Sequence, residues 1–375
     1  MADHLEMVIL GDGIAGRAMA LALAQSGMAS TIIAPKDTPP LLGGIQLAPN
    51  GWAALETLGL TAAAEKIAQP LAMMRLLSAD SGNTLVEIDL TPTRRRPYAS
   101  LPRQGLSDIL GKAAKATKLV TWKSGEGTAL ATQPDHVALT LKGAKAPLTT
   151  RYLIGADGAH GLGRQFVQAE ENPIQKPAPR SAFRCVIPLN DLPPSLAAKS
   201  TSVWLGDGGH MVFYPLSSGH LNLVAVTTAG TSAQRQAQAL VKSQPLLQPL
   251  APYLAAATQL PLHRHSTLDV LRRGNVILAG DAAHPMPPHL AQGAGQSLID
   301  ASLMKTMLAE ASDLNAVITP WCVQRIKATK MVMEKADRAG KIFALDGPLT
   351  HLRNIGLATF GGPAMARELD RIWQS

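Results

Sequence analysis

The first 26 residues hold the pattern that most restricts how this chain can fold. Met7 to Leu10 is a short apolar run of the buried-strand type, and the turn Gly11-Asp12-Gly13-Ile14-Ala15-Gly16 follows it directly. A helical stretch rich in Ala, Leu and Met then runs to Ser26. In such a unit Gly11 permits the tight turn, Gly13 lets the backbone approach a pyrophosphate, and Gly16 lets the helix pack against the strand. The pattern predicts an α/β, Rossmann-like domain that binds a dinucleotide through this turn, Ile14 and Ala15 included.

Length and composition agree with a globular, multi-domain chain. With 375 residues, 46% hydrophobic and 17% charged, the chain can bury two large cores. No apolar run reaches the roughly 18 residues of a transmembrane helix, so we expect no integral membrane segment. Acidic residues near the start, Asp3 and Glu6, argue against a signal peptide. The only two cysteines, Cys185 and Cys322, give neither a disulfide framework nor a metal-ligand spacing, which favours a reducing cytoplasm and no metal.

The charge balance is basic, with 35 Lys and Arg against 27 Asp and Glu, a formal net charge of +8. The densest cluster is Arg94-Arg95-Arg96. Nucleic acid is not the expected partner, because aromatic residues make up only 4% of the chain. A positive field could steer an anionic nicotinamide cofactor or a carboxylate substrate. For the arginine cluster itself we favour a solvated basic surface.

A second glycine-rich segment, Leu278 to Ala301, places a carboxylate beside a helix start. A strand-like run delivers Gly280 and Asp281 to a strand end, a Pro-rich loop follows, and Gln292-Gly293-Ala294-Gly295 opens a long helical stretch. A carboxylate at a strand tip suits a sugar-like hydroxyl, while the free N–H groups of a helix start suit an anionic oxygen. Such groups could hold the ribityl chain and the pyrimidine edge of a flavin.

This segment resembles the GD motif of the class A flavoprotein aromatic monooxygenases, which have the p-hydroxybenzoate hydroxylase fold. The chain looks like a single-component FAD hydroxylase of the salicylate and 6-hydroxynicotinate hydroxylase type. The resemblance extends to Gly155-Ala156-Asp157-Gly158, which is similar to the family's DG motif with Arg164 as its downstream arginine. It implies that Asp157 acts near the cofactor. Gly161 stands where that motif commonly has serine, and a plain strand-ending turn is the alternative reading.

Two further segments match the family. Gly43 to Asn50 resembles its GIQLxPN loop, which makes Gln46 a candidate substrate-lining residue and Asn50 a candidate N-cap of a helix over residues 51–58. An ordinary loop-to-helix junction is an equal alternative. Arg103 opens a predicted helix that runs to about Ala116, at the place where the family carries an arginine that contacts the flavin.

One position departs from the pattern. The acid that usually holds the adenosine ribose, about 20 residues after the glycines, is replaced by Ala34 at the end of the run Ser30 to Ala34. Either Asp37 reaches back, or backbone and water hold the ribose, or FAD binds more weakly. We favour altered ribose contacts over loss of FAD.

The strand pattern and the resemblance together divide the chain. We expect a discontinuous FAD-binding domain over residues 1–71, 97–175 and 263–340, a mostly antiparallel β substrate domain over 72–96 and 176–262, and a helical C-terminal segment over 341–375. Residues 71–90 read as a hairpin. The runs 210–215 and 221–226 pair plausibly as another, and His210, Val212 and Tyr214 share one face of it. We expect this polar face to line the pocket.

The loop after Asp281 contains two histidines. His284 is expected to orient the loop. His289 follows Pro288 on the side expected to face the substrate, and its near-neutral pKa suits it to accept a phenolic proton. A polar residue hydrogen-bonded within a loop is the equal alternative. We therefore expect His289, with His210 or Tyr214, as catalytic residues, and Gln46 and Pro288 as further substrate-lining residues.

The resemblance implies a reaction. NADPH or NADH reduces FAD, O₂ converts the reduced flavin into a C4a-hydroperoxide, and a phenolic or hydroxylated heteroaromatic small molecule is hydroxylated while water is kept away. The chain would act as a monomer or homodimer. A quinone-biosynthesis ring hydroxylase and a flavin-binding protein without hydroxylase activity are the alternatives. A flavin-dependent halogenase is disfavoured, since no two tryptophans stand two residues apart.

Overall fold

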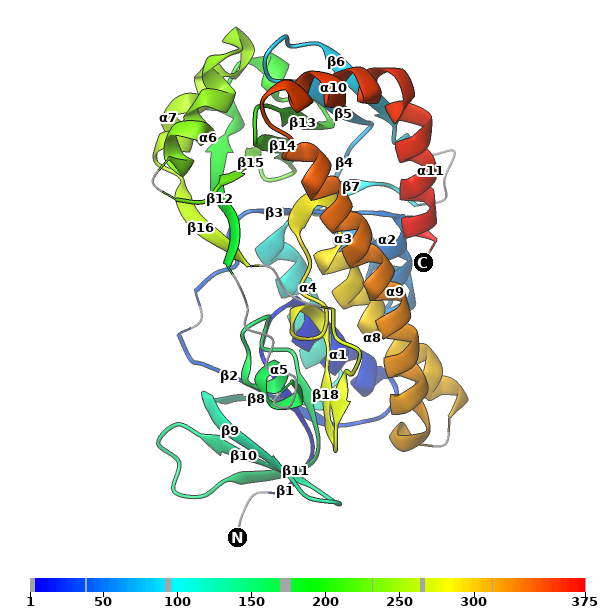
Figure 1. Cartoon of the computed structure of the whole chain (residues 1–375). Helices are drawn as coiled ribbons and strands as arrows, with labels where there is room; N and C mark the ends of the chain where they lie inside the picture. The colour runs from blue at the N-terminus through cyan, green and yellow to red at the C-terminus, as the bar shows by residue number, and fades with distance from the viewer. Residues whose placement is uncertain are drawn as a thin grey trace.

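The computed structural model describes residues 4–37, 39–91, 96–168, 177–230, 232–263, 267–311 and 313–374. Figure 1 shows two large sheets towards opposite ends of the molecule, with the long helix α9 (Leu314–Phe343) running between the two ends. A small sheet, β3 (Gly44–Leu47), β7 (Ala99–Pro102) and β4 (Gln69–Pro70), lies between the two large sheets (Figure 1).

The first large sheet has eight strands, with the order β17-β18-β11-β1-β2-β8 and with β10 and β9 attached beside β11. Its strands are β1 (His4–Leu10), β2 (Ser30–Ala34), β8 (Val120–Ser124), β9 (Gly127–Thr132), β10 (Val137–Leu141), β11 (Leu148–Gly155), β17 (Arg272–Arg273) and β18 (Val276–Leu278). The strands β18, β11, β1, β2 and β8 run parallel. Because parallel strands are covered on both faces, β1 is apolar almost throughout, with Met7, Val8 and Ile9 all buried.

Helices cover one face of this parallel sheet. They are α1 (Ile14–Gln25), α2 (Pro49–Thr57), α3 (Thr61–Glu65), α4 (Arg103–Ala116) and α8 (Gly293–Glu310), together with the first part of α9. The carboxyl ends of the parallel strands meet at one edge, where the glycine turn and the loop of Asp281 follow β1 and β18. Ligands of open α/β sheets bind at such an edge.

The second large sheet has seven strands in the order β16-β12-β15-β14-β13-β5-β6. They are β5 (Met73–Ser78), β6 (Thr84–Asp89), β12 (Pro177–Pro188), β13 (Ser200–Leu205), β14 (His210–Leu216), β15 (His220–Thr228) and β16 (Thr258–His263). All neighbours are antiparallel except β13 and β5. The predicted α/β fold with a second, mostly antiparallel sheet and a helical C-terminus is therefore confirmed.

The two faces of this sheet have different neighbours. Met211 and Phe213 of β14 pack towards α6 (Ala233–Lys242) and α7 (Ala251–Ala255), in one hydrophobic cluster. Alternate residues of a strand point to opposite faces, so His210 and Tyr214 face the other way. That other face is covered by the second half of α9, by α10 (Pro348–Gly356), by the π-helical turn η6 (Leu357–Gly361) and by α11 (Gly362–Trp373).

The remaining short elements are α5 (Leu162–Val167) and the 3-10 turns η1 (Leu189–Asp191), η2 (Pro194–Leu196), η3 (Pro245–Leu250), η4 (Gly280–Ala282) and η5 (Pro288–Leu290). The division of the chain into three domains stays a prediction. Helix α9 continues through residue 340, where the C-terminal segment was expected to begin.

One expectation about local structure is wrong. Helix α2 begins at Pro49 with Ala48 as its N-cap, so Asn50 does not cap it. Proline is favoured at the first helical position because its missing N–H needs no partner there. Asn50 is instead buried inside the helix, where its amide donates to Gln292 Oε1 at 2.9 Å and ties α2 to the start of α8. The strand β9 was not foreseen.

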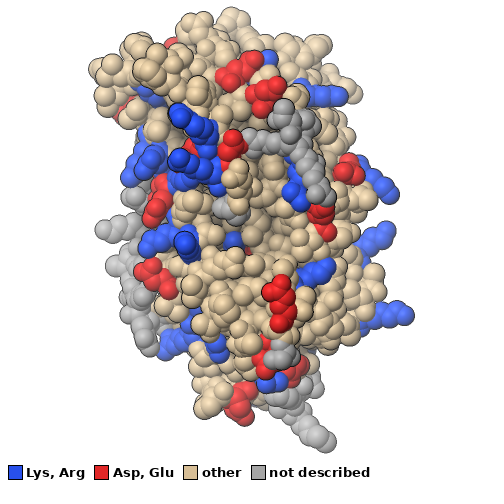
Figure 2. All heavy atoms as spheres, turned by 90° about the vertical axis from the view of Figure 1, so that its right-hand side faces the viewer, with Lys and Arg blue, Asp and Glu red and all other residues tan. Residues whose placement is uncertain are grey.

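The charged side chains are spread over the surface. On the face where α9 and α11 lie, Figure 2 shows Lys and Arg interspersed with Asp and Glu, with the densest basic group at its upper left. Arg94 and Arg95 lie outside the described residues, and Arg96 donates to Glu56 Oε2 at 2.9 Å. In the described part of the chain, no helix combines the length and the apolar character needed to cross a membrane.

Candidate active site

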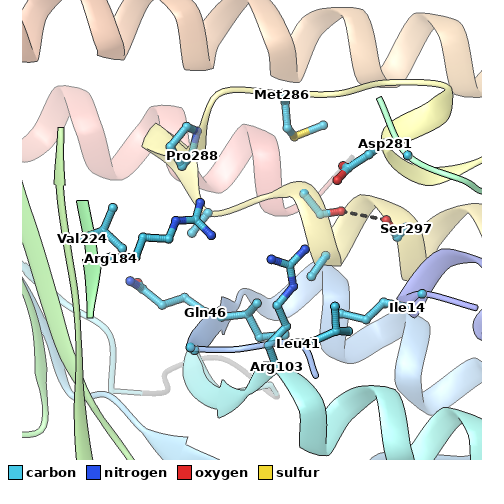
Figure 3. Close-up of a pocket in the computed structure, with 18 of the residues that line it drawn as sticks. Ile14, Leu41, Gln46, Arg103, Arg184, Val224, Asp281, Met286, Pro288 and Ser297 are labelled. Carbon is cyan, nitrogen blue, oxygen red and sulfur yellow. Dashed lines mark hydrogen bonds between the residues drawn. The ribbon is translucent and has the colours of Figure 1, made fainter. Parts of the chain in front are cut away.

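A single large cavity of about 1750 Å³ opens where the carboxyl edge of the eight-stranded sheet faces the seven-stranded sheet. Its lining comes from the glycine turn, the end of β2, the start of α4, the loop of Asp281 and the strands β12, β14 and β15. The second half of α9 and the segment from η6 to α11 close its other side. Figure 3 shows side chains from these separate elements converging on one space.

The three glycines of the turn have different environments. Gly11 has φ +114°, and a Cβ there would lie 2.4 Å from Ala156 O. A Cβ on Gly16 would lie 2.0 Å from Gly11 O, so only glycine lets α1 start this close to β1. A Cβ on Gly13 would meet no described atom within 4 Å, and Gly13 lies on the cavity wall with Ile14 and Ala15. Its open backbone leaves room for a cofactor, while Gly11 and Gly16 are required by packing.

Asp12, the second residue of the turn, is held in place at the cavity wall. Its carboxylate accepts Arg17 Nε at 2.8 Å and Arg17 Nη2 at 2.7 Å, and it also accepts Trp122 Nε1 at 3.0 Å. Trp122 belongs to β8, which lies on the far side of β2 from β1. Asp12 therefore reaches past the end of β2, where Ala34 replaces the expected acid. Sequence reasoning missed this residue, although an acid inside a glycine turn was a signal.

The DG segment is joined to the loop of Asp281 by a buried arginine. Arg164 is 1% exposed, and its Nη1 donates to the carbonyls of Ala282 at 2.8 Å and Ala283 at 3.2 Å. Burial lowers the pKa of Arg164 to about 10. The arginine thus fixes the geometry of one motif relative to the other.

Asp157 lies at the cavity wall between these motifs. Its Oδ2 accepts Gly163 N at 3.0 Å, its Oδ1 has no hydrogen-bond partner within the described part of the chain, and burial raises its pKa. A Cβ on Gly161 would lie 2.1 Å from Asp157 Cγ. With Asp157 in this position, a serine at position 161 would collide with its carboxylate.

Asp281 and the start of α8 form the next part of the wall. Asp281 is exposed to the cavity, and Gly293 and Ala294 line it beside Asp281. Gly280 and Gly295, expected beside the cofactor, are not among the lining residues. A Cβ on Gly280 would lie 2.4 Å from Ala15 Cβ, and Gly295 is buried against Gly51 of α2. Gly280 is therefore required where the loop approaches Ala15, whereas a Cβ on Gly295 would make only ordinary contacts, the nearest at 3.9 Å.

A buried network behind this wall holds the loop and α8 together. Asp300 accepts Gly280 N at 2.7 Å, His284 Nε2 at 2.8 Å and Arg325 Nε at 2.6 Å. Burial alone would raise the pKa of Asp300, but the charges of His284 and Arg325 lower it to about 2. The network places His284 as expected, in an orienting position. Sequence reasoning missed Asp300 and Arg325, which stand 25 residues apart.

Two arginines face the cavity from opposite sides. Figure 3 shows the guanidinium groups of Arg103, at the start of α4, and Arg184, on β12, directed into the same space. Arg103 Nε is buried and has no hydrogen-bond partner among the described residues. Burial and the charge of Arg103 lower the pKa of Arg184. Tyr214 and Asp281 act in the opposite direction on the pKa of Arg184. Because the two positive charges approach each other and Arg103 Nε has no described partner, the space between them is suited to an anion. Arg184 was missed, since an arginine on a strand reads as a solvated residue.

The face of β14 that was expected to line the pocket does so. His210 and Tyr214 are 2% and 5% exposed and lie on the cavity wall with Val212. Burial raises the pKa of Tyr214. Gln46 also lines the cavity, and its Oε1 accepts the hydroxyl of Tyr98 at 2.6 Å.

His289, with Pro288, extends this wall from the loop. The His210 and His289 rings lie 5.2 Å apart, and Phe343 lies 5.2 Å and 6.2 Å from them. Neither histidine Nδ1 has a hydrogen-bond partner within the described residues. The expected near-neutral pKa of His289 is wrong: burial, with a smaller effect from Arg180, lowers it to about 4. Burial and the neighbouring His289 hold the pKa of His210 well below its usual value. Both imidazoles are therefore neutral near pH 7.

A glycine-lined edge of a parallel sheet that faces an antiparallel sheet across one cavity is the arrangement expected of a flavin-dependent oxidoreductase. Residues 4–316 match the family described as FAD binding domain, and the chain belongs to this family, among its FAD-dependent aromatic hydroxylases. The buried, unpartnered Arg103 Nε and the open backbone of Gly13 fit FAD. The predicted family and the predicted cofactor are confirmed.

Similar proteins and structures support this assignment over the full length. The chain is 31% identical to 3-hydroxybenzoate 6-hydroxylase 1 of Aquipseudomonas alcaligenes, with 94% of this chain and 93% of that protein covered. It is 27% identical to 3-amino-4-hydroxybenzoate 2-monooxygenase PtmB3 of Streptomyces platensis, with 94% and 92% covered. Its fold is similar to that of Klebsiella pneumoniae HpxO complexed with FAD and uric acid, with a TM-score of 0.85, 22% identity, and 99% and 97% coverage.

Proposed function

We propose that this FAD-dependent hydroxylase acts on a small aromatic ring that carries both a hydroxyl and a carboxylate, with NADH or NADPH as electron donor. The observation that carries the proposal is the pair Arg184 and His289 on the walls of one cavity, a cation and a neutral imidazole whose Nδ1 has no described partner. The similarity to hydroxybenzoate hydroxylases supports the same substrate class.

The residues around FAD have separate roles in this proposal. Gly13 and the adjacent backbone hold the pyrophosphate, Asp281 accepts hydrogen bonds from the ribityl hydroxyls, and Arg103 neutralises negative charge on the cofactor. The N–H groups of Gly293 and Ala294, at the positive end of α8, face the pyrimidine edge. When bound, FAD accepts hydride from the nicotinamide and activates O₂ for transfer to the substrate.

The substrate lies against the seven-stranded sheet. Arg184 binds its carboxylate by a charge-assisted hydrogen bond. His289 or His210, both neutral, accepts the hydrogen of the ring hydroxyl and so raises the electron density of the ring. Tyr214 and Gln46 orient the ring, and the apolar residues around them keep water from the reacting atoms.

The electron donor and the cellular compartment are also part of this proposal. We propose that NADH or NADPH binds transiently, as the family resemblance implies. Within the described residues both cysteines are free thiols, and burial raises the pKa of each to about 11. Two unpaired thiols fit a reducing cytoplasm.

The proposal is tested with purified protein reconstituted with FAD. Bound FAD is quantified after denaturation, and NADH or NADPH oxidation and O₂ uptake are then measured with 3-hydroxybenzoate, salicylate and 6-hydroxynicotinate. We expect about one FAD per chain, and at least one compound should stimulate O₂ uptake and give a hydroxylated product.

Two variants test the proposed cofactor site and the proposed substrate site separately. Asp281→Ala should lose most of its FAD, while Arg184→Gln should keep FAD and raise KM for the acid at least tenfold, since a hydrogen bond to a charged group contributes about 1.5 to 3 kcal/mol. Full FAD content in Asp281→Ala would remove that residue from the cofactor site. A holoenzyme that oxidises NAD(P)H without giving any hydroxylated product would contradict the substrate class.

A further inference from the structure

The cavity continues beyond the place proposed for the substrate ring. Past His289 its lining passes to apolar side chains of β5, α9 and the segment from η6 to α11. We call this part the apolar arm and define it by Met74, Leu76, Ala339, Phe343, Leu357 and Met365. The arm belongs to the same cavity as the two histidines, so one ligand can occupy both.

The cavity is large enough to hold FAD, a substrate ring and a further group in the apolar arm. Its volume is about 1750 Å³, whereas a site for one cofactor or drug-sized ligand measures about 300 to 1000 Å³. FAD accounts for one such site, and a single aromatic ring fills only a small part of the rest. A substrate with a substituent on its ring would use the remaining volume.

The chemistry of the arm is uniformly apolar. Leu76 and Phe343 are buried in a hydrophobic cluster, and Met74, Ala339, Leu357 and Met365 pack against that cluster while remaining partly exposed. Their exposed surface faces the cavity that they line. The thioethers of Met74 and Met365 sit on flexible side chains, which adapt to ligands of different shape.

The two ends of the arm are chemically different. At the inner end of the arm, the Phe343 ring lies 5.2 Å from the His210 ring. A substrate ring whose hydroxyl contacts a histidine would therefore place its apolar edge against Phe343. Towards the surface, Lys335 of α9 pairs with Glu368 of α11 at 3.0 Å, and both line the cavity. Both helices lie on the charged face of Figure 2. The polarity therefore changes from polar at the ring, to apolar along the arm, to charged at solvent.

We propose that the ring of the natural substrate carries an unbranched alkyl chain, which lies in the apolar arm between β5 and the helices α9 and α11. This inference rests on the proposed function for the position of the ring. Each buried methylene strengthens binding about fourfold. Immobilising a flexible chain offsets part of this gain, so we expect affinity to rise at least tenfold from an ethyl to a hexyl substituent.

The test measures binding as well as turnover. The FAD-loaded enzyme is titrated with 3-hydroxybenzoates that carry an ethyl, butyl, hexyl or octyl chain at ring position 4 or, in a second series, at position 5, and binding is followed by the perturbation of flavin absorbance. Stimulated NAD(P)H oxidation and hydroxylated product are measured in parallel. In at least one series Kd should fall with chain length.

Three variants test where the alkyl chain of the substrate binds. Ala339→Phe fills the arm from α9 and Leu357→Trp fills it from η6, so both should remove the gain from chain length while binding of the ethyl compound changes less than about threefold. Ala364→Phe is the matched control, because Ala364 is exposed on α11 and does not line the cavity. It should keep the full gain.

The outcomes separate this inference from the proposed function. Chain-dependent binding that is lost in Ala339→Phe and Leu357→Trp supports the arm even if no phenol is hydroxylated, in which case only the function fails. Hydroxylation with a Kd that does not change with chain length overturns the arm and leaves the function intact. A gain from chain length that survives in both variants also overturns it, and absence of both binding and turnover overturns both proposals.

Discussion

At the scale of single residues, Asp12 is the feature that changes the account of the cofactor site. The sequence left three explanations for Ala34, and one of them was that Asp37 reaches back. In the structure Asp37 is exposed at the cavity wall, whereas Asp12 is fixed beside the end of β2 by Arg17 and Trp122. A carboxylate that is already oriented costs less to engage, so Asp12 is the better candidate to accept the ribose hydroxyls.

We therefore expect Asp12→Asn to weaken FAD binding about tenfold, the size of one hydrogen bond to a charged group. Asp37→Asn is the matched control and should change the Kd less than about twofold. Quenching of flavin fluorescence on titration of apoprotein measures both. The reverse ranking of the two variants would return the role to Asp37.

The sequence predicted the site residues that belong to a motif. It did not predict the residues that reach the site only because distant segments fold together. As expected, the cavity is lined by the glycine turn, by Asp281 and by Arg103. His210 and Tyr214, which share one face of their strand, line it as well. Arg184 and Asp300 could not be predicted, because distant segments of the chain form the surroundings of each. The pKa of His289 was wrong for the same reason, since burial depends on α9 and not on the loop that carries it.

At the scale of elements, α9 sets the position of His289. The helix has a glycine at position 340, where a Cβ would lie 2.5 Å from His289 Cδ2 and Nε2. The histidine ring therefore packs directly on the backbone of α9. No sequence pattern showed this contact, because the helix and the loop are separated by the whole of α8.

Gly340→Ala should displace His289 without removing it. We expect kcat for the best aromatic substrate to fall about tenfold or more, because general acid–base catalysis contributes roughly 10² to 10⁴ and depends on hydrogen-bond geometry. FAD content should stay unchanged. Gly356→Ala is the control, since Gly356 is helical and a Cβ there meets no described atom within 4 Å. Unchanged kcat in Gly340→Ala would show that the position of His289 does not limit the reaction.

At the scale of the whole molecule, the buried histidines make the fold sensitive to acid. In the unfolded chain the pKa of histidine is about 6.5. In the folded chain burial lowers the pKa of His289 to about 4 and holds the pKa of His210 well below its usual value. Between these values the unfolded state holds more protons, so stability falls as pH falls. Asp300 adds a separate loss at lower pH, because its stabilising charge disappears only between its ordinary pKa near 4 and about 2.

Thermal unfolding of the apoprotein between pH 7.5 and 4.5 tests this dependence. Tm should fall steadily below about pH 6.5, and His289→Gln should flatten the slope. His351→Gln, at an exposed position of α10, is the control and should leave the slope as it is. Equal slopes in all three proteins would show that His289 titrates normally in the folded state.

The order of strands in the parallel sheet also determines when this protein can become active during its synthesis. β1 pairs with β11, and β11 pairs in turn with β18, which contains only Val276–Leu278. Asp300 and its partner Arg325 are translated later still. Because β10 pairs only with Leu148 to Thr150 of β11, a nascent chain on the ribosome lacks the β18 partner of Leu153 to Gly155 until most of the message has been read. The part of the cavity wall that contains Asp281 and the start of α8 is translated only after β18, so we expect flavin to bind after most of the chain has been synthesised.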